Sequence, residues 1–77
     1  MPIRDYIAEF LRTHGDLELD TIPAGATLND LELDSLTVLS LIVLVEKEYG
    51  LEVPEREVVA ARTFADLMGL VGVTPAH

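Results

Sequence analysis

The stretch over residues 35–49 constrains the fold of this chain more than any other part. Its residues from Leu36 to Val45 are apolar except at Thr37 and Ser40, and Gly50 follows Tyr49. The apolar positions recur at helical spacing and do not alternate with polar ones as in a half-buried strand. A glycine after such a run is a common helix stop. The pattern predicts a helix over residues 35–49 that other parts of the chain cover on several sides.

This helix carries two adjoining apolar stripes. The stripe assigned to the core consists of Val38, Leu41, Ile42, Val45 and Tyr49. The other stripe consists of Leu36, Leu39 and Val43. An apolar stripe bordered by charged residues is a frequent interface signature. The second stripe is therefore either buried against the chain or exposed as a docking surface for a partner.

Three more helices are predicted around it. Residues 3–13 have the apolar spacing of an amphipathic helix, which Gly15 ends. After Pro54, residues 55–60 form a short helix anchored by Val58 and Val59. A last helix follows Thr63, with Asp66 placed for a variant of the capping box. Its core face consists of Phe64, Leu67, Met68 and Val71.

The predicted fold class is all-α, a small four-helix bundle of three longer helices and one short helix. A long loop over residues 15–34 joins the first two helices, and its spaced leucines pin it to the core. The chain is expected to be a single domain over residues 1–77 with an ordered core of about residues 3–72 and a frayed tail over residues 74–77.

Charge and composition exclude several classes of function. Fourteen acidic residues against five basic ones give a net charge of −9, which disfavours nucleic acid and anionic membranes as partners. There is no cysteine for disulfides, thiolate catalysis or cysteine-ligated zinc. No apolar segment is long enough to span a bilayer, and no signal peptide is recognised. We expect a soluble, cytoplasmic monomer.

No catalytic or metal site is predicted. The two histidines, His14 and His77, have no nucleophile or pocket placed to work with them. Asp30, Glu32 and Asp34 alternate, but they lack the twelve-residue ligand spacing and the central glycine of a calcium-binding loop.

The tripeptide Asp34-Ser35-Leu36 lies where the long loop ends and the apolar helix begins. The free N–H groups and the positive dipole end of a helix N-terminus favour an anion, so a serine there is well placed to carry a phosphate ester. Aspartate and serine are also preferred N-caps, and a plain cap is the simpler interpretation. The tripeptide alone leaves both interpretations open.

The surroundings of this tripeptide make the chain resemble the acyl and peptidyl carrier proteins. The matching features, in order, are Leu31, Asp34-Ser35-Leu36, Glu46-Lys47-Glu48-Tyr49-Gly50, Val53-Pro54-Glu55-Arg56-Glu57 and Thr63-Phe64-Ala65-Asp66-Leu67. Together they cover roughly residues 3–71. Each motif is weak by itself, whereas the ordered set is specific.

The resemblance implies that Ser35, with Asp34 and Leu36 as motif neighbours, carries 4′-phosphopantetheine transferred from coenzyme A. The arm would hold acyl or aminoacyl groups as thioesters, and the protein would have no catalytic activity of its own. Its partners would be a phosphopantetheinyl transferase, a loading enzyme and a downstream transferase or synthase. The expected partner interface consists of Leu36, Thr37, Leu39, Val43 and Glu46.

Two departures from the family pattern refine this expectation. Glu32 stands where many members have glycine, and Thr37 and Ser40 stand where fatty-acid carriers usually have acidic residues. The thinner acidic stripe favours a dedicated carrier in polyketide, nonribosomal peptide or related specialised biosynthesis. The alternative is a non-enzymatic helical interaction module, or a carrier that is never modified, in which Ser35 is only an N-cap.

Overall fold

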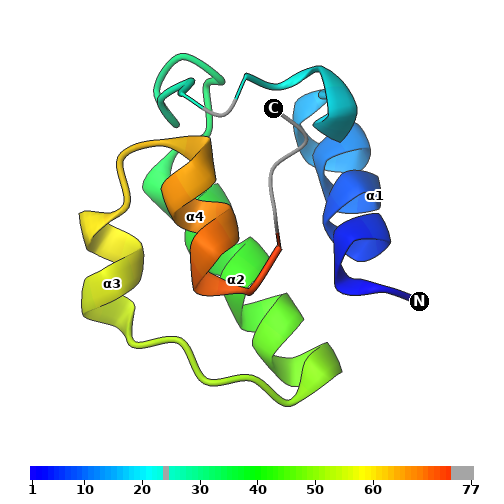
Figure 1. The fold of residues 1–77 in the computed structure, drawn as a ribbon, viewed down its shortest axis with the longest axis vertical. Helices are drawn as coiled ribbons and strands as arrows, with labels where there is room; N and C mark the ends of the chain where they lie inside the picture. The colour runs from blue at the N-terminus through cyan, green and yellow to red at the C-terminus, as the bar shows by residue number, and fades with distance from the viewer. Residues whose placement is uncertain (24, 74–77) are drawn as a thin grey trace.

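The computed structural model describes residues 1–23 and 25–73, and this part of the chain is helical (Figure 1). It contains the helices α1 (Ile3–Gly15), α2 (Ser35–Tyr49), α3 (Glu55–Ala60) and α4 (Phe64–Leu70), and the 3₁₀ turn η1 (Leu19–Thr21). None of these helices is long and apolar enough to cross a membrane. The predicted all-α fold is confirmed, but two of these helices are long and two are short, because α4 has 7 residues and α3 has 6. The expected frayed tail, residues 74–77, lies outside the described residues.

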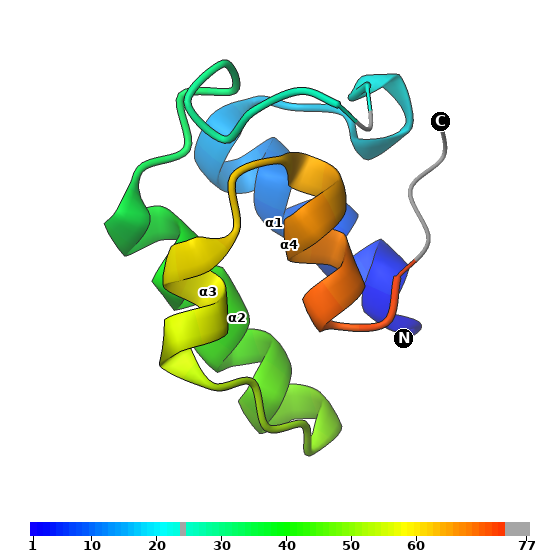
Figure 2. The ribbon, with the colours of Figure 1, turned by 60° about the vertical axis from the view of Figure 1, so that its left-hand side comes forward.

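Helix α2 is the centre of the packing. α1 packs along one side of it and α3 along another, and α3 in turn contacts α4 (Figures 1 and 2). The predicted core stripe is confirmed at Val38, Leu41, Ile42 and Val45, which are buried, whereas Tyr49 is only half-buried against the core. The predicted core face of α4, which consists of Phe64, Leu67, Met68 and Val71, is buried as well. The periodicity of the two helices thus indicated their inner faces correctly.

The end of α1 differs from the prediction. Gly15 is the last helical residue, and Asp16 takes the left-handed conformation with φ 53°. Aspartate tolerates this region better than most residues because its short side chain can bond locally. A Cβ on Gly15 would lie 3.2 Å from the Leu17 side chain. The glycine therefore makes room for Leu17, and Asp16 makes the turn.

The anchoring of α3 also differs from the prediction. Val58 is buried, but Val59 is 73% exposed. Successive residues of a helix point about 100° apart, so two neighbours in a single short helix seldom face the same core. Only Val58 anchors α3.

The long loop is held by backbone hydrogen bonds as well as by its leucines. Leu28 N–H donates to the Arg62 carbonyl at 3.1 Å, and Phe64 N–H donates to the Ala26 carbonyl at 2.8 Å. These two bonds form an isolated antiparallel bridge between Thr27 and Thr63. Buried Leu19, Ile22 and Leu33 add side-chain contacts. The prediction that the loop is pinned to the core is confirmed, but the bridge was not foreseen.

Glu32 lies in the left-handed region with φ 57°. A left-handed conformation costs a residue with a Cβ roughly 1–2 kcal/mol, whereas glycine adopts it freely. We therefore expect Glu32→Gly to be more stable than Glu32→Ala by about 1 kcal/mol, measured by urea unfolding. Alanine is the matched control because it removes the same charge and keeps the Cβ. Equal stability of the two variants would show that position 32 is not strained.

Candidate functional site

Asp34, not Ser35, caps α2. The Asp34 backbone is extended, and its Oδ1 accepts a hydrogen bond of 2.8 Å from Thr37 N–H. Ser35 is the first helical residue, its side chain is exposed, and within the described residues its hydroxyl makes no hydrogen bond. The interpretation of Ser35 as a plain N-cap is therefore wrong. Its hydroxyl is free to react.

The first turn of α2 leaves donors near Ser35. Thr37 N–H bonds to the Asp34 side chain, and Val38 N–H bonds to the Asp34 carbonyl. The N–H groups of Ser35 and Leu36 have no partner in the part of the chain that the structure describes. Unpaired N–H groups at the positive end of a helix dipole stabilise an anion. Both groups are therefore available to hold an anion at this end of α2.

The hydrogen bond from Thr37 N–H lowers the pKa of Asp34 below its ordinary value. A carboxylate with a lowered folded-state pKa stabilises the fold above its unfolded pKa of about 3.9 and loses that effect as the pH falls through the folded pKa. An asparagine at this position would still cap α2 but would not titrate. We therefore expect the stability advantage of the wild type over Asp34→Asn to be constant above about pH 5 and to shrink below it. Urea unfolding at a series of pH values measures this, and a difference that stays constant down to pH ~3 would contradict it.

An apolar pocket of about 220 Å³ lies next to Ser35. It is formed by α2, α3 and the long loop, and its lining consists of Leu28, Ser35, Val38, Leu39, Val58, Val59 and Ala61. Leu28 is held in place by its N–H bond to Arg62. The serine hydroxyl and a small apolar cavity are thus neighbours.

The residues of the expected partner interface fall into two groups. Leu36 is 73% exposed, Val43 is 55% exposed, and Leu39 is half-buried between them. Thr37 and Glu46 are also half-buried, and each bonds within the chain. The Thr37 N–H bonds to Asp34, and the Glu46 carboxylate accepts a 2.9 Å bond from Val53 N–H. Glu46 thus holds the segment that connects α2 to α3.

One exposed residue was missed. Leu44 is 41% exposed and lines a shallow groove with Leu39, Ser40 and Val43. Leu44 lies on neither predicted stripe of α2. Its position outside the core stripe could have indicated that it is exposed. We call the set of Leu36, Leu39, Val43 and Leu44 the α2 apolar surface.

Comparisons with known proteins give a family match and similar curated proteins. Residues 2–71 match the family described as "Phosphopantetheine attachment site". The chain is 35% identical over 51 residues to the acyl carrier protein AcpXL of Mesorhizobium japonicum, a match that covers 65% of this chain and 55% of that protein. It is 29% identical over 66 residues to the meromycolate extension acyl carrier protein of Mycobacterium tuberculosis, covering 84% of this chain and 57% of that protein.

A solved structure is similar as well. The crystal structure of an acyl carrier protein from Thermotoga maritima superposes with a TM-score of 0.69 at 26% sequence identity. The superposition covers 90% of this chain and 85% of that one. By contrast, the chain spans little more than half the length of the two curated relatives.

Proposed function

This chain belongs to the family of proteins with a phosphopantetheine attachment site, and from that premise we propose that it is an acyl carrier domain modified on Ser35. The observation that carries the proposal is the accessibility of the Ser35 hydroxyl. This hydroxyl is exposed and, among the described residues, makes no hydrogen bond, because Asp34 is the N-cap of α2. The unpaired N–H groups of Ser35 and Leu36 lie where a phosphate would need them.

The chain presents the Ser35 hydroxyl for modification and then tethers the attached group. In the modification, a bond forms between Ser35 Oγ and the phosphorus of the phosphopantetheine group. The bond from that phosphorus to the nucleotide part of coenzyme A breaks, and the hydroxyl proton leaves. The attached arm supplies the thiol that this cysteine-free chain lacks. Tethering then raises the effective concentration of the cargo at each partner's active site, while this chain performs no catalysis itself.

The apolar pocket beside Ser35 supports an acyl rather than an aminoacyl cargo. Apart from Ser35, its lining consists of leucine, valine and alanine side chains, which offer no charged partner for an amine. The names of the similar proteins, all acyl carrier proteins, agree with this assignment. We place the carrier in a specialised pathway, polyketide or related, since Thr37 and Ser40 replace the acidic residues usual in fatty-acid carriers.

The experiment that tests the proposal is modification in vitro. The full chain is incubated with coenzyme A and a promiscuous phosphopantetheinyl transferase, and its intact mass is measured. We expect a gain of one phosphopantetheine group. A folded protein that gains no mass in a reaction where a known carrier is fully modified would identify an unmodified, degenerate carrier instead.

The apolar character of α2 predicts how partners recognise the chain. Contacts through the α2 apolar surface are less sensitive to salt than contacts through exposed carboxylates. We expect the transferase reaction with the wild type to slow less between about 50 and 300 mM salt than the reaction with a Thr37→Glu, Ser40→Glu double variant. Initial rates across the salt series measure this. An equal or steeper fall for the wild type would show that its remaining acidic residues dominate recognition.

A further inference from the structure

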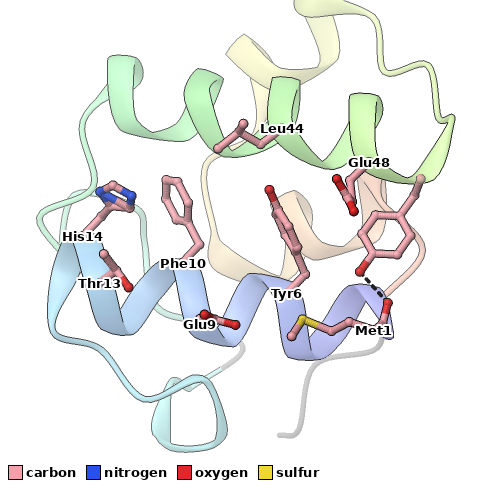
Figure 3. A pocket seen from close by; sticks show the side chains of 9 residues that line it. Met1, Tyr6, Glu9, Phe10, Thr13, His14, Leu44 and Glu48 are labelled. Carbon is pink, nitrogen blue, oxygen red and sulfur yellow. Dashed lines mark hydrogen bonds between the residues drawn. The ribbon is translucent and has the colours of Figure 1, made fainter.

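A second groove lies between α1 and α2, away from the Ser35 pocket (Figure 3). Its volume is about 570 Å³, and it shares no lining residue with the pocket beside Ser35. Side chains of Tyr6 and Phe10 on α1 and of Leu44 on α2 project into the space between the two helices (Figure 3). Apart from Leu44, which also belongs to the α2 apolar surface, its lining residues have no part in the proposed carrier function.

The aromatic walls of the groove are ordered. The rings of Tyr6 and Tyr49 meet edge to face with centroids 5.8 Å apart. The Tyr49 hydroxyl donates to the Met1 carbonyl at 2.5 Å, the bond dashed in Figure 3. Further along α1, the rings of Phe10 and His14 lie 4.2 Å apart. The groove therefore offers preformed aromatic and aliphatic surface.

The charged side chains that line the groove, within the described residues, are two carboxylates, and the α-amino group of Met1, which also lines it, is positive. Glu9 on α1 and Glu48 on α2 line it, and neither has an ion pair within the described residues. The two arginines of α1 pair elsewhere, Arg4 with Asp20 and Arg12 with Glu18. Among the described residues, no lysine or arginine lines the groove. The pKa of Tyr49 is raised, mainly by desolvation and then by the Glu48 carboxylate.

We propose that this groove docks a partner protein through an amphipathic helix that presents an arginine beside a leucine-like residue. The guanidinium would pair with the carboxylate of Glu9 or of Glu48, which lie on opposite helices (Figure 3), and stack on a tyrosine ring. The apolar residue would pack on Leu44 and Phe10. A partner bound here leaves Ser35 uncovered. Since Leu44 also belongs to the α2 apolar surface, the groove extends that surface around α2 toward α1.

The probe is a blocked, helical peptide of alanine, leucine and arginine, titrated into the isotope-labelled full chain and followed by amide chemical shifts. A second peptide has citrulline in place of arginine, which keeps the shape and removes the charge. We expect shifts confined to residues 6–14 and 44–49, and binding at least about tenfold weaker for the citrulline peptide. Shifts centred on α3 or around Ser35, or equal binding of the two peptides, would overturn the proposal.

Matched variants separate a specific site from general attraction to an acidic protein. The double variant Glu9→Gln, Glu48→Gln should weaken binding of the arginine peptide by about tenfold. This is the effect expected from the loss of the exposed ion pairs at Glu9 and Glu48. Glu52→Gln with Glu57→Gln makes the same charge change on exposed residues outside the groove and should weaken it less than about twofold. If both double variants weaken binding equally, the attraction is general and the groove is not a site. Ser35→Ala should bind the peptide as the wild type does, because docking here does not depend on the modification.

Discussion

Ser35→Ala is expected to abolish phosphopantetheine transfer to this chain. The substitution removes the nucleophilic oxygen, so the mass gain should fall from complete to undetectable. The fold should be unchanged, because the Ser35 side chain is exposed and Asp34 provides the N-cap of α2. Intact-mass spectrometry gives the modification and circular dichroism gives the fold.

Ser40→Ala is the matched control for this experiment. Ser40 is also an exposed serine of α2, but it lies beyond the first turn, where the helix dipole no longer favours an anion. Its alanine variant should gain one phosphopantetheine group at the wild-type rate. A Ser35→Ala protein that still gained the group, or a Ser40→Ala protein that did not, would move the attachment site away from Ser35.

Leu41→Asp is expected to unfold the domain. Leu41 is 2% exposed in the centre of the core. Truncating a buried leucine to alanine already costs about 2–5 kcal/mol, and an unpaired buried carboxylate adds to this. Small domains without disulfides or metals rarely have more than about 3–5 kcal/mol of stability. The far-ultraviolet circular dichroism at room temperature should therefore lose its helical signal.

Val43→Asp provides the control on the same helix. Val43 is 55% exposed on the α2 apolar surface, so the same charge placed there should cost less than about 1 kcal/mol. Leu39, another residue of the α2 apolar surface, is less suitable because it packs against the core and lines the Ser35 pocket. If Val43→Asp unfolded the protein and Leu41→Asp did not, the inner and outer faces of α2 would be exchanged.

The parts of the fold that side-chain chemistry dictates were predictable. Apolar spacing placed Leu41 and Val45 inside, and Gly50, with φ 68°, ends α2. The Thr63 and Asp66 capping box begins α4 as the sequence indicated. These features depend on local spacing, which a single sequence displays directly.

The features that were missed depend on backbone geometry or on contacts between helices. The bridge between Thr27 and Thr63 uses main-chain N–H and carbonyl groups, which every residue except proline supplies equally. The left-handed conformation falls on Asp16, and an aspartate does not indicate this conformation in a sequence as a glycine does. The groove between α1 and α2 depends on how two helices are placed, which periodicity within each helix does not determine.

The candidate site was predictable in position but not in detail. The ordered motifs placed Ser35 at the start of α2, and the structure has it there. Which of Asp34 and Ser35 caps the helix could not be decided from the sequence, because both residue types are good N-caps. The hydrogen bond from Thr37 N–H to the Asp34 side chain shows that Asp34 is the cap. The Ser35 hydroxyl is therefore not used in capping.

The Thr27–Thr63 bridge also sets an order of events during synthesis. A nascent chain that has emerged from the ribosome only as far as α2 already contains Ser35. It lacks the Arg62 carbonyl and the Phe64 N–H that fix the loop beside that serine. Val58, Val59 and Ala61, which form the other wall of the pocket, come just as late. Because small domains fold as units, the complete site forms only after α4 has emerged from the ribosome. Translation of α4 therefore precedes any modification that depends on the finished site.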